Sequence, residues 1–371
     1  MKKAIVSVIN DLSTDQRVNK TCNTLVKLGF DVFLVGRRKK NSYELQKRNY
    51  RTYRFNMLFE KGPLFYSFYN IRLFLLLLFK KTDLLFSNDL DTLLPNYWVS
   101  RIKKIPLVYD SHEYFTDVPE LIDRPKIQKF WKRIERSIFP KLNDIITVNS
   151  SIAALYQNEY HKDITVVRNI SPIQTHSSVK TRLELGLPED KHLIILQGAG
   201  INIQRGSEEA LEAMQYLENA VLLIVGDGDV IPILKETSKK PEFLDKILFI
   251  PKQSPEQLFH YTASADIGLS LDKDTNINYR FSLPNKIFDY INAFIPILAS
   301  SLPEIKKIID EYQIGCIIDS HDPKHIADKI QYMLEDVKMR EIWKKNLILA
   351  SESLNWESEE KILISLLQKY A

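Results

Sequence analysis

Short apolar runs alternate with longer amphipathic stretches along this 371-residue chain, and the pattern starts again in its second half. Short runs bounded by polar turns are typical of buried strands, and the stretches between them are typical of crossover helices. A single hydrophobic core stops growing at roughly 250 to 300 residues. The sequence therefore predicts an α/β protein with two doubly wound, Rossmann-like domains that face each other across a cleft at their strand ends, where ligands of such sheets bind.

Six strands and five helices are expected in the first domain. The strands are placed at 4–9, 31–35, 84–86, 107–109, 144–148 and 165–167, and the helices around 15–28, 66–80, 93–102, 126–141 and 150–160. The polar, turn-rich segment RNISPIQTHSSVKTRLELGLPED follows and indicates a domain boundary. We place the first domain at residues 1–172 and the second at 173–352.

The second domain repeats the pattern. Its strands are expected at 193–197, 221–225, 247–249, 267–270, 297–299 and 316–318. Residues 353–371 then predict a terminal helix that docks back on the first domain, because Asn355 can cap it and apolar residues recur along one face.

Charge and cysteine content exclude some partners. The 51 basic and 47 acidic side chains leave a net charge of only +4, which argues against a general nucleic-acid binder. Cys22 and Cys316 have no His or Cys neighbours at metal-ligand spacing, which fits a reducing compartment and argues against a zinc site.

The start MKKAIVSVIN is too short and strand-like for a signal peptide, so we expect a cytoplasmic protein. The apolar run LFLLLLF at 73–79 is far shorter than the ~20 residues that cross a bilayer, and its ordinary interpretation is a buried helix packed on a sheet. Preceding aromatic residues and the flanking Arg72, Lys80 and Lys81 also resemble an interfacial helix. The alternative is a peripheral contact of residues 63–81 with the inner face of the cell membrane.

Two glycine loops at predicted strand ends are candidates for binding phosphate. In LQGAGINIQRGSEEAL, Gly200 and Gly206 allow close approach of the backbone, and Arg205 precedes a helix whose first amides would face the same anion. Gly226 and Gly228 expose backbone at the same predicted edge. The glycines match neither the dinucleotide fingerprint nor a Walker loop, and a plain turn is the alternative.

A third candidate is the start of a predicted helix in SLPNKIFDYI. Ser282 and Pro284 mark this start, and the first amides together with Lys286 would point at an anion. Asp289 follows Lys286 by three positions and shares its helical face. An exposed ion pair of little energetic weight is the alternative interpretation.

Four segments in order resemble family 4 glycosyltransferases of the GT-B fold: INDLSTDQRVNK, VYDSHEYF, LQGAGINIQRG, and SLPNKIFDYI followed by IPILAS. The resemblance spans nearly the whole chain and is closest to bacterial members with SLPNK at the donor site. It implies transfer of a sugar, with retention, from a UDP- or GDP-linked donor to a hydroxyl of a glycan or lipid-linked acceptor, as in polysaccharide biosynthesis. It implies no obligatory metal or other cofactor.

The resemblance also assigns roles to residues. His112 would face the donor sugar, Arg205 and Lys286 would hold the diphosphate, and Asp289 would accept hydrogen bonds from the ribose. The donor-binding set is then Gly200, Arg205, Gly206, Gly226, Gly228, Ser282, Leu283, Asn285, Lys286 and Asp289, and the acceptor or cleft set is Asp11, Asp15, Asp110 and Glu113. For His112, the alternative is an orienting role in a polar loop.

Two positions depart from the family pattern. Many relatives carry two glutamates eight positions apart, where this chain has Phe281 and Asp289, and many carry an arginine where this chain has Gly200. The triplet at 89–91, Asp-Leu-Asp, resembles the paired aspartates that hold manganese in the other glycosyltransferase fold. We discount it because the other motifs belong to a metal-independent architecture.

Two other functions are compatible with these residues. A sugar-nucleotide epimerase shares the scaffold and would release a changed sugar nucleotide without an acceptor. A catalytically silent nucleotide-binding partner protein is the other, and Phe281 is the residue that favours it.

Overall fold

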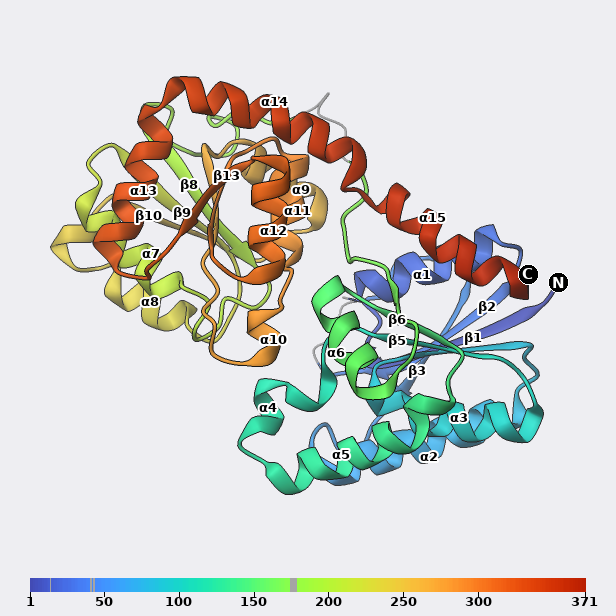
Figure 1. The fold of residues 1–371 in the computed structure, drawn as a ribbon. Helices are drawn as coiled ribbons and strands as arrows, with labels where there is room; N and C mark the ends of the chain where they lie inside the picture. Colours follow the sequence, from blue (N-terminus) through green and yellow to red (C-terminus); the bar gives the residue numbers. More distant parts are fainter. Residues whose placement is uncertain (14, 41, 43, 174–178) are drawn as a thin grey trace. The chain divides into compact units, whose positions relative to one another are not determined.

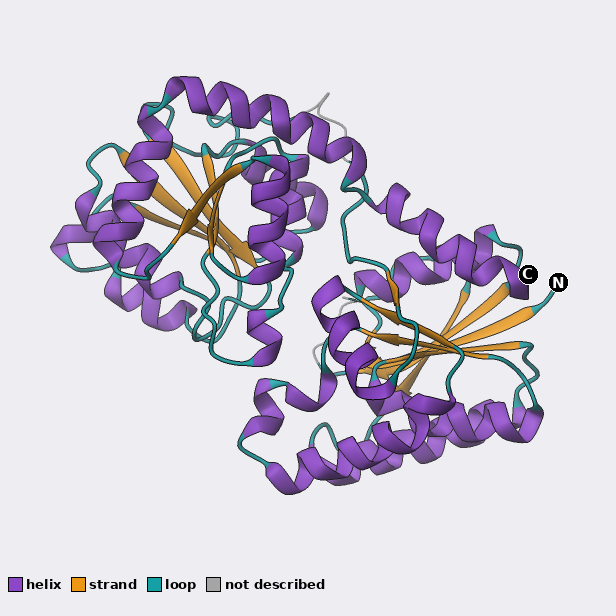
Figure 2. Ribbon diagram, viewed as in Figure 1, coloured by secondary structure: helices purple, strands orange, loops and turns teal. Residues whose placement is uncertain are grey.

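The computed structural model describes residues 1–13, 15–40, 42, 44–173 and 179–371. Contacts group the chain into two units, one formed by Met1–Asn169 with Glu359–Ala371 and the other by Ile170–Ser358. Each unit contains one sheet with helices on its faces (Figures 1 and 2). The prediction of two doubly wound, Rossmann-like sheets is confirmed.

The first sheet has seven strands in the order β3-β2-β1-β4-β5-β6-β7, all parallel to their neighbours. The strands are β1 (Lys3–Asp11), β2 (Asp31–Arg38), β3 (Arg51–Asn56), β4 (Leu84–Asn88), β5 (Leu107–Ser111), β6 (Asp144–Thr147) and β7 (Thr165–Val166). The expectation of six strands was wrong by one, because β3 was missed. As an edge strand, β3 buries only Phe55, and charged residues lie among its other side chains. It therefore lacks the apolar run of a central strand.

Helices cover both faces of this sheet. They are α1 (Gln16–Lys27), α2 (Gly62–Phe79), α3 (Leu90–Lys103), α4 (Pro119–Ile122), α5 (Pro125–Ile138) and α6 (Ser150–Tyr160). In Figure 1, α1 lies on one face, and α2, α3 and α5 form a layer on the other.

The helix α2 is longer than the apolar run that marked it in the sequence. It spans 18 residues with a mean hydropathy of 1.4, so by length and composition alone it is able to cross a bilayer, a property that core helices of folded domains share. Length and composition alone are weak evidence for a membrane span. In the first unit the helix packs on the sheet through Phe65, Tyr69, Leu73 and Leu77, and the Tyr69 hydroxyl donates to the carbonyl of Val8 at 2.7 Å.

The C-terminal helix α15 (Trp356–Leu367) joins the first unit from Glu359 onward. Glu359 accepts hydrogen bonds from the backbone and the guanidinium of Arg168, both at 2.7 Å. Glu360 accepts from the Thr24 hydroxyl and the Lys27 ammonium on α1. The return of the final helix to the first domain rests on these polar contacts and on the buried Leu363 and Leu367, which are part of the predicted apolar stripe.

The second sheet has six parallel strands in the order β10-β9-β8-β11-β12-β13. The strands are β8 (His192–Gly198), β9 (Ala220–Gly226), β10 (Ile247–Ile250), β11 (Ile267–Ser270), β12 (Ile297–Ser300) and β13 (Gly315–Ile318). All six were expected from the sequence. The helices are α7 (Ser207–Ala213), α8 (Ile231–Thr237), α9 (Pro255–Ala263), α10 (Ile277–Arg280), α11 (Asn285–Asn292), α12 (Pro303–Tyr312), α13 (Pro323–Glu335) and α14 (Val337–Ser353).

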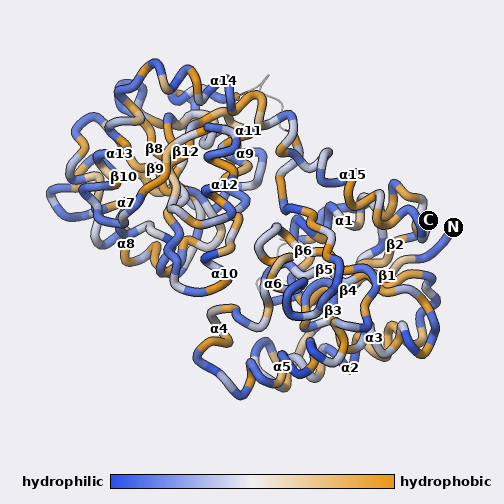
Figure 3. Tube along the Cα trace, viewed as in Figure 1, coloured by the Kyte–Doolittle hydropathy of each residue, from blue (hydrophilic) through white to orange (hydrophobic). Residues whose placement is uncertain are grey.

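Alternate residues of the central strands enter two cores, one on each face of this second sheet. Leu193 and Ile195 of β8 pack into one core, and Ile194 and Leu196 pack into the other. A strand that is buried on both faces reads as a continuous apolar run, which is why the sequence located these strands so well. Figure 3 shows the hydrophobic colouring that β8, β9 and β12 share.

Candidate functional site

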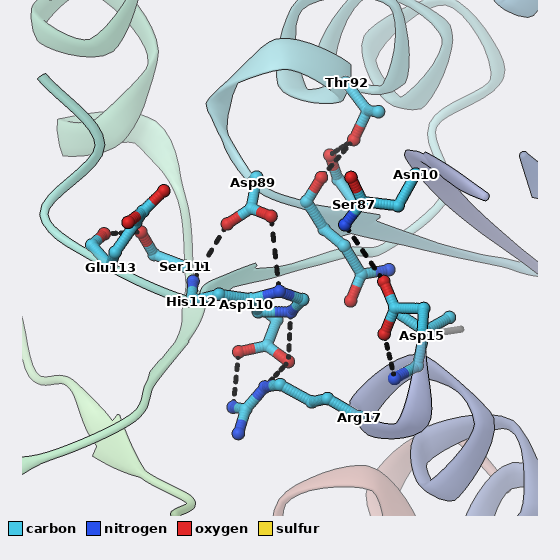
Figure 4. Close-up of polar contacts among 12 residues, drawn as sticks. Asn10, Asp15, Arg17, Ser87, Asp89, Thr92, Asp110, Ser111, His112 and Glu113 are labelled. Atoms are coloured by element: carbon cyan, nitrogen blue, oxygen red, sulfur yellow. Dashed lines mark hydrogen bonds and ion pairs between the residues drawn. The ribbon is translucent and has the colours of Figure 1, made fainter. Parts of the chain in front are cut away.

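In the first unit, two neighbouring strands end beside one another and bring Asp89 and His112 together. Strands β4 and β5 pair in parallel with Asn88 opposite Asp110, so the residues that follow each strand meet at the carboxyl edge of the sheet. One carboxylate oxygen of Asp89 accepts the backbone N–H of His112 at 2.9 Å, and the other lies 3.2 Å from its Nδ1 (Figure 4). The imidazole is therefore fixed in orientation.

A buried arginine holds the second carboxylate beside the imidazole. Arg17 donates from Nε and Nη2 to the two oxygens of Asp110, at 2.9 and 2.7 Å, and from Nη1 to the carbonyl of Val167. Asp110 in turn lies 3.5 Å from Nε2 of His112. The His112 ring thus lies between two carboxylates, one of which is already paired with a guanidinium.

These contacts decide the charges of the cluster. Burial alone would lower the pKa of His112, but Asp89 and Asp110 outweigh it and raise that pKa to about 9. Burial would raise the pKa of Asp110, but Arg17 and His112 together hold it well below its usual range. His112 is therefore a cation at neutral pH, and it can donate a proton or a hydrogen bond but cannot accept one.

The backbone of Asp89 is strained. Its φ of 59° and ψ of 164° lie in a region that residues other than glycine rarely adopt, at a cost of about 1 to 3 kcal/mol. Strain of this kind persists where the surrounding structure requires it, and here it aims the carboxylate at His112.

The sequence interpretation underrated this region. Discounting the triplet at 89–91 as a metal motif left Asp89 without a role, and Arg17 was not singled out. Asp91, the other carboxylate of the triplet, is buried in α3, and burial raises its pKa well above the usual value. Within the described residues, no group of three or more His, Cys, Asp or Glu side chains is arranged to hold a metal ion.

The remaining acceptor-side candidates are placed around this cluster or near β1. Asp11 ends β1, is buried, and accepts hydrogen bonds from the amide and hydroxyl of Ser13 at 3.1 and 2.9 Å. Asp15 caps α1 by accepting the amide of Val18 at 3.0 Å, so its role in the structure is local. Glu113 follows His112 and is exposed. Position 14 of the loop between Asp11 and Asp15 lies outside the described residues.

In the second unit, glycines shape the loops that follow β8 and β9. The residue Gly226 has a φ of 143°, and a Cβ there would lie 1.8 Å from the carbonyl oxygen of Gly198 on the adjacent strand. At Gly206, with a φ of 72°, a Cβ would lie 2.2 Å from the carbonyl oxygen of Leu271. Only glycine fits at these two positions. At Gly200, by contrast, the nearest atom is 3.7 Å away, so close packing does not demand glycine there.

Both predicted phosphate-binding cations converge on a carboxylate that the sequence interpretation missed. Arg205 Nη1 lies 2.7 Å and Lys286 Nζ lies 3.6 Å from the two oxygens of Asp272, which is completely buried. Burial alone would raise the pKa of Asp272, but Lys286 and Arg205 outweigh it and lower the pKa. The Arg205 guanidinium also lies 4.3 Å from the ring centre of Tyr279.

A signal for Asp272 was present in the sequence. It follows β11 by two positions, and side chains just after a parallel strand gather at the carboxyl edge of the sheet. Its side chain holds both cations at that edge, and Arg205 retains an Nε that makes no hydrogen bond within the described part of the chain.

The helix α11 begins where the sequence placed it. Pro284 is the N-cap residue and Asn285 the first helical residue, and the Ser282 hydroxyl makes no capping bond. Asp289 accepts hydrogen bonds from Ser171 Oγ at 2.7 Å and Gln197 Nε2 at 3.1 Å. Its carboxylate is thus oriented by neighbouring side chains from two other segments.

Two protein-family models match this chain. The model described as "Glycosyltransferase Family 4" matches residues 16–170, and the model described as "Glycosyl transferases group 1" matches residues 180–348. The first match contains the His112 cluster, and the second contains Arg205, Asp272 and Lys286.

Curated relatives are distant. A D-inositol 3-phosphate glycosyltransferase of Xylanimonas cellulosilytica is 22% identical over 50% of this chain and 45% of its own length. An alpha-monoglucosyldiacylglycerol synthase of Streptococcus pneumoniae is 21% identical over 59% of this chain and 52% of its own length. This chain therefore spans about half the length of these curated relatives.

Similarity to solved structures extends over the whole chain. Anabaena HepE in complex with UDP and glucose has a TM-score of 0.74 at 12% identity, with 100% of both chains covered. At this identity the likeness concerns the fold. The chain therefore has the GT-B fold and carries, in order, the two domains of a family 4-like glycosyltransferase.

Proposed function

We propose that this protein transfers a sugar from a nucleoside diphosphate sugar to a hydroxyl of a glycan or lipid-linked acceptor, with retention at the anomeric carbon and without an obligatory metal. The donor is a UDP- or GDP-sugar, and binds the second unit at the loops after β8, β9 and β11. The first unit supplies His112 and the acceptor-side residues. A subgroup assignment to bacterial members with SLPNK at the donor site is part of this proposal.

The observation that carries the proposal is the convergence of Arg205 and Lys286 on the buried Asp272. Transfer requires that the nucleoside diphosphate leave with added negative charge as the C1–O bond breaks. Positive groups that are fixed before the reaction stabilise that charge without reorganising. Asp272 cancels one of the two positive charges, so a diphosphate that arrives meets oriented donors with one net positive charge.

The first amides of α11 add to this site. They lack partners within the helix, as at every helix start, and they carry the positive end of the helix dipole. The glycines at 206 and 226 keep side chains away from the same edge. Asp289, whose carboxylate is held by two hydrogen bonds, is suited to accept from a ribose hydroxyl.

We assign to His112 a charged role. With a pKa near 9 it is an imidazolium at neutral pH, so it would donate a hydrogen bond to the sugar and would not act as a general base. In a retaining transfer of this kind, the acceptor oxygen bonds to C1 on the face that the diphosphate leaves. The acceptor proton then passes to the departing phosphate oxygen.

The test is a thermal-shift and ligand-detected NMR panel of UDP- and GDP-sugars, followed by product analysis. A donor at 100 times its Kd should stabilise the wild type by about 2.7 kcal/mol. The double variant Arg205→Ala/Lys286→Ala should lose this stabilisation. Arg280→Ala, which removes a nearby exposed cation paired with Asp274, should retain it. NMR of the product anomeric proton then reports retention or inversion, and EDTA should leave the rate unchanged.

Phe281 favours one alternative, a protein that binds a sugar nucleotide without turning it over. In that case the panel would show stabilisation, but neither transfer nor hydrolysis would follow with any acceptor. A changed sugar nucleotide released without an acceptor would instead identify an epimerase. No stabilisation by any sugar nucleotide would overturn the donor site itself.

A further inference from the structure

The helix α2 is apolar on its outward face as well as on the face that contacts the sheet. Four residues spaced by four positions are buried: Phe65, Tyr69, Leu73 and Leu77. The opposite stripe is exposed and consists of Leu64, Ser67, Ile71, Leu75 and Phe79. Phe79 is 82% exposed and Leu64 is 63% exposed. A surface helix of a globular domain normally carries polar residues on such a face, so this stripe indicates a partner.

Neighbouring helices extend the apolar stripe sideways. On α3, Trp98 and Ile102 are exposed, and on α5, Ile127 and Phe130 are exposed. Aromatic contacts join the three helices into one layer. The ring centres of Phe74 on α2 and Trp98 on α3 are 6.1 Å apart, and those of Tyr66 on α2 and Trp131 on α5 are 5.3 Å apart. Figure 1 shows α2, α3 and α5 side by side on one face of the first sheet. We call the outward surface of these three helices the α2–α3–α5 face.

Charge on this face is mostly positive. Along α2, α3 and α5, all of whose residues are described, the only acids are Asp91 and Glu135, and both are buried. At the helix ends, Glu60 and Asp123 are exposed acids. The exposed cations on these helices and at their ends are more numerous: Lys61, Lys81, Arg101, Lys104, Arg124, Lys126, Lys129, Arg133 and Arg136. Exposed apolar residues together with an excess of exposed cations over exposed acids are the composition of a surface that binds anionic lipid.

A protein partner fits this composition less well. Protein interfaces are depleted of lysine at their centres, and their charges are complemented by both signs. Here Lys126 and Lys129 lie within one turn of the exposed Ile127 and Phe130 on α5. Long basic side chains with apolar stems, next to Trp and Phe, are suited to the boundary between headgroups and acyl chains.

We propose that the α2–α3–α5 face docks on the surface of a membrane that contains anionic lipids. The apolar stripe of α2 enters the headgroup boundary, with Trp98 and Phe130 beside it. The cations of α5 and of the helix ends contact lipid phosphates. The helix α2 lies on the membrane and does not cross it, since its other face is packed on the sheet through Tyr69 and its neighbours. This inference stands apart from the proposed transfer reaction, because docking requires no donor or acceptor.

Sedimentation of the full chain with vesicles tests the proposal. Vesicles of phosphatidylcholine with phosphatidylglycerol should bind the protein, pure phosphatidylcholine vesicles should bind it much more weakly, and rising salt should weaken the binding by screening. Each Lys or Arg at an anionic leaflet contributes a factor of about five. Lys126→Gln/Lys129→Gln/Arg133→Gln should therefore bind about a hundredfold more weakly.

A second triple variant measures how much the apolar residues of α2 contribute to vesicle binding. Ile71→Ser/Leu75→Ser/Phe79→Ser changes only exposed side chains of α2 and should weaken binding on the order of a hundredfold. The matched control Lys338→Gln/Lys344→Gln/Lys345→Gln removes three exposed cations from α14 in the other unit and should leave binding unchanged.

Trp98 provides a reporter inside the face. Of the four tryptophans it is the exposed one, whereas Trp131, Trp343 and Trp356 are buried. Brominated lipids in the anionic vesicles should quench Trp98, and Trp98→Phe should abolish that quenching.

Three results would overturn the proposal: equal binding to neutral and anionic vesicles, wild-type binding by either triple variant, or an unquenched Trp98. A wild-type dimer in analytical ultracentrifugation that becomes a monomer in the Ile71/Leu75/Phe79 variant would show that a second copy covers the face. The vesicle assay uses no sugar nucleotide, so its failure leaves the transferase proposal intact and the reverse also holds.

Discussion

Asp89 contacts His112 twice, at the backbone amide and at Nδ1 of the ring, from the end of the neighbouring strand. A carboxylate that binds both atoms fixes the position of the histidine and also its charge. The strained φ of 59° at Asp89 gives the same indication, because the chain would avoid this conformation unless the contact required it. We therefore regard Asp89 as the positioning residue for His112.

Replacing Asp89 by asparagine should lower the pKa of His112. The amide oxygen can still accept the backbone N–H, but the negative charge beside Nδ1 is lost, so the pKa should fall from about 9 toward the ordinary value of 6.5. Imidazole chemical shifts in a pH titration measure this directly. Asp91→Asn is the control, because the carboxylates that contact the ring nitrogens of His112 are those of Asp89 and Asp110. A His112 pKa that stays near 9 in Asp89→Asn would contradict the positioning role.

Stability should depend on pH through His112. Its folded pKa is raised above the unfolded value of 6.5, so its protonation stabilises the fold fully below about pH 6.5, and this stabilisation is lost as pH rises through 9. The contribution is about 3 kcal/mol at most. The difference in unfolding free energy between wild type and His112→Gln should shrink over this window in denaturant titrations. A difference independent of pH between about 6 and 10 would argue that the histidine is not a cation in the fold.

Removal of Arg17 should destabilise the first unit strongly. The Arg17 and Asp110 side chains are 5% and 2% exposed, and loss of one partner leaves a buried charge uncompensated. Such a loss costs about 3 to 5 kcal/mol. Chemical denaturation of Arg17→Met should show it, and Arg17→Met/Asp110→Asn should recover much of the loss. If the double variant is no more stable than the single one, the cost comes from packing and not from the charge.

Glycines at the donor edge should differ in their tolerance of alanine. Gly226→Ala places a Cβ 1.8 Å from a backbone oxygen and imposes a φ of 143° on alanine, so the second unit should lose at least about 1 to 3 kcal/mol of stability. Gly200→Ala meets nothing closer than 3.7 Å and should be nearly neutral for folding. Melting temperatures of the two variants provide the comparison. If Gly226→Ala were as stable as Gly200→Ala, the backbones of β8 and β9 would be able to move apart at little cost.

The Gly200→Ala variant also distinguishes an effect on folding from an effect on donor binding. Gly200 belongs to the proposed phosphate loop, so Gly200→Ala should keep its melting temperature while its stabilisation by a sugar nucleotide decreases. Unchanged stabilisation would remove Gly200 from the donor-binding set without affecting the cation pair.

The pattern of buried residues along each strand depends on neighbouring positions, so it could be predicted from the sequence. The central strands β8, β9, β11 and β12 are buried on both faces, so each appeared as an apolar run between turns. Both glycine loops were found at strand ends, and the start of α11 was found from its proline. The edge strand β3 escaped because it is exposed and buries only Phe55. The length of α2 was also underestimated, since Gly62 to Phe65 extend the helix before its predicted start at Tyr66.

Pairing of side chains across the fold was decided only by the tertiary structure. Arg17 and Asp110 are 93 positions apart, and Arg205 and Asp272 are 67 positions apart, so no local pattern links them. The order of the strands in each sheet brings such residues to one edge, and the register then fixes which atoms meet. The sequence determined which residues are buried or turn-forming, because these are properties of neighbouring positions. The charge of His112 and the orientation of Arg205 and Lys286 depended on strand order and register, which arise only when distant segments pack together.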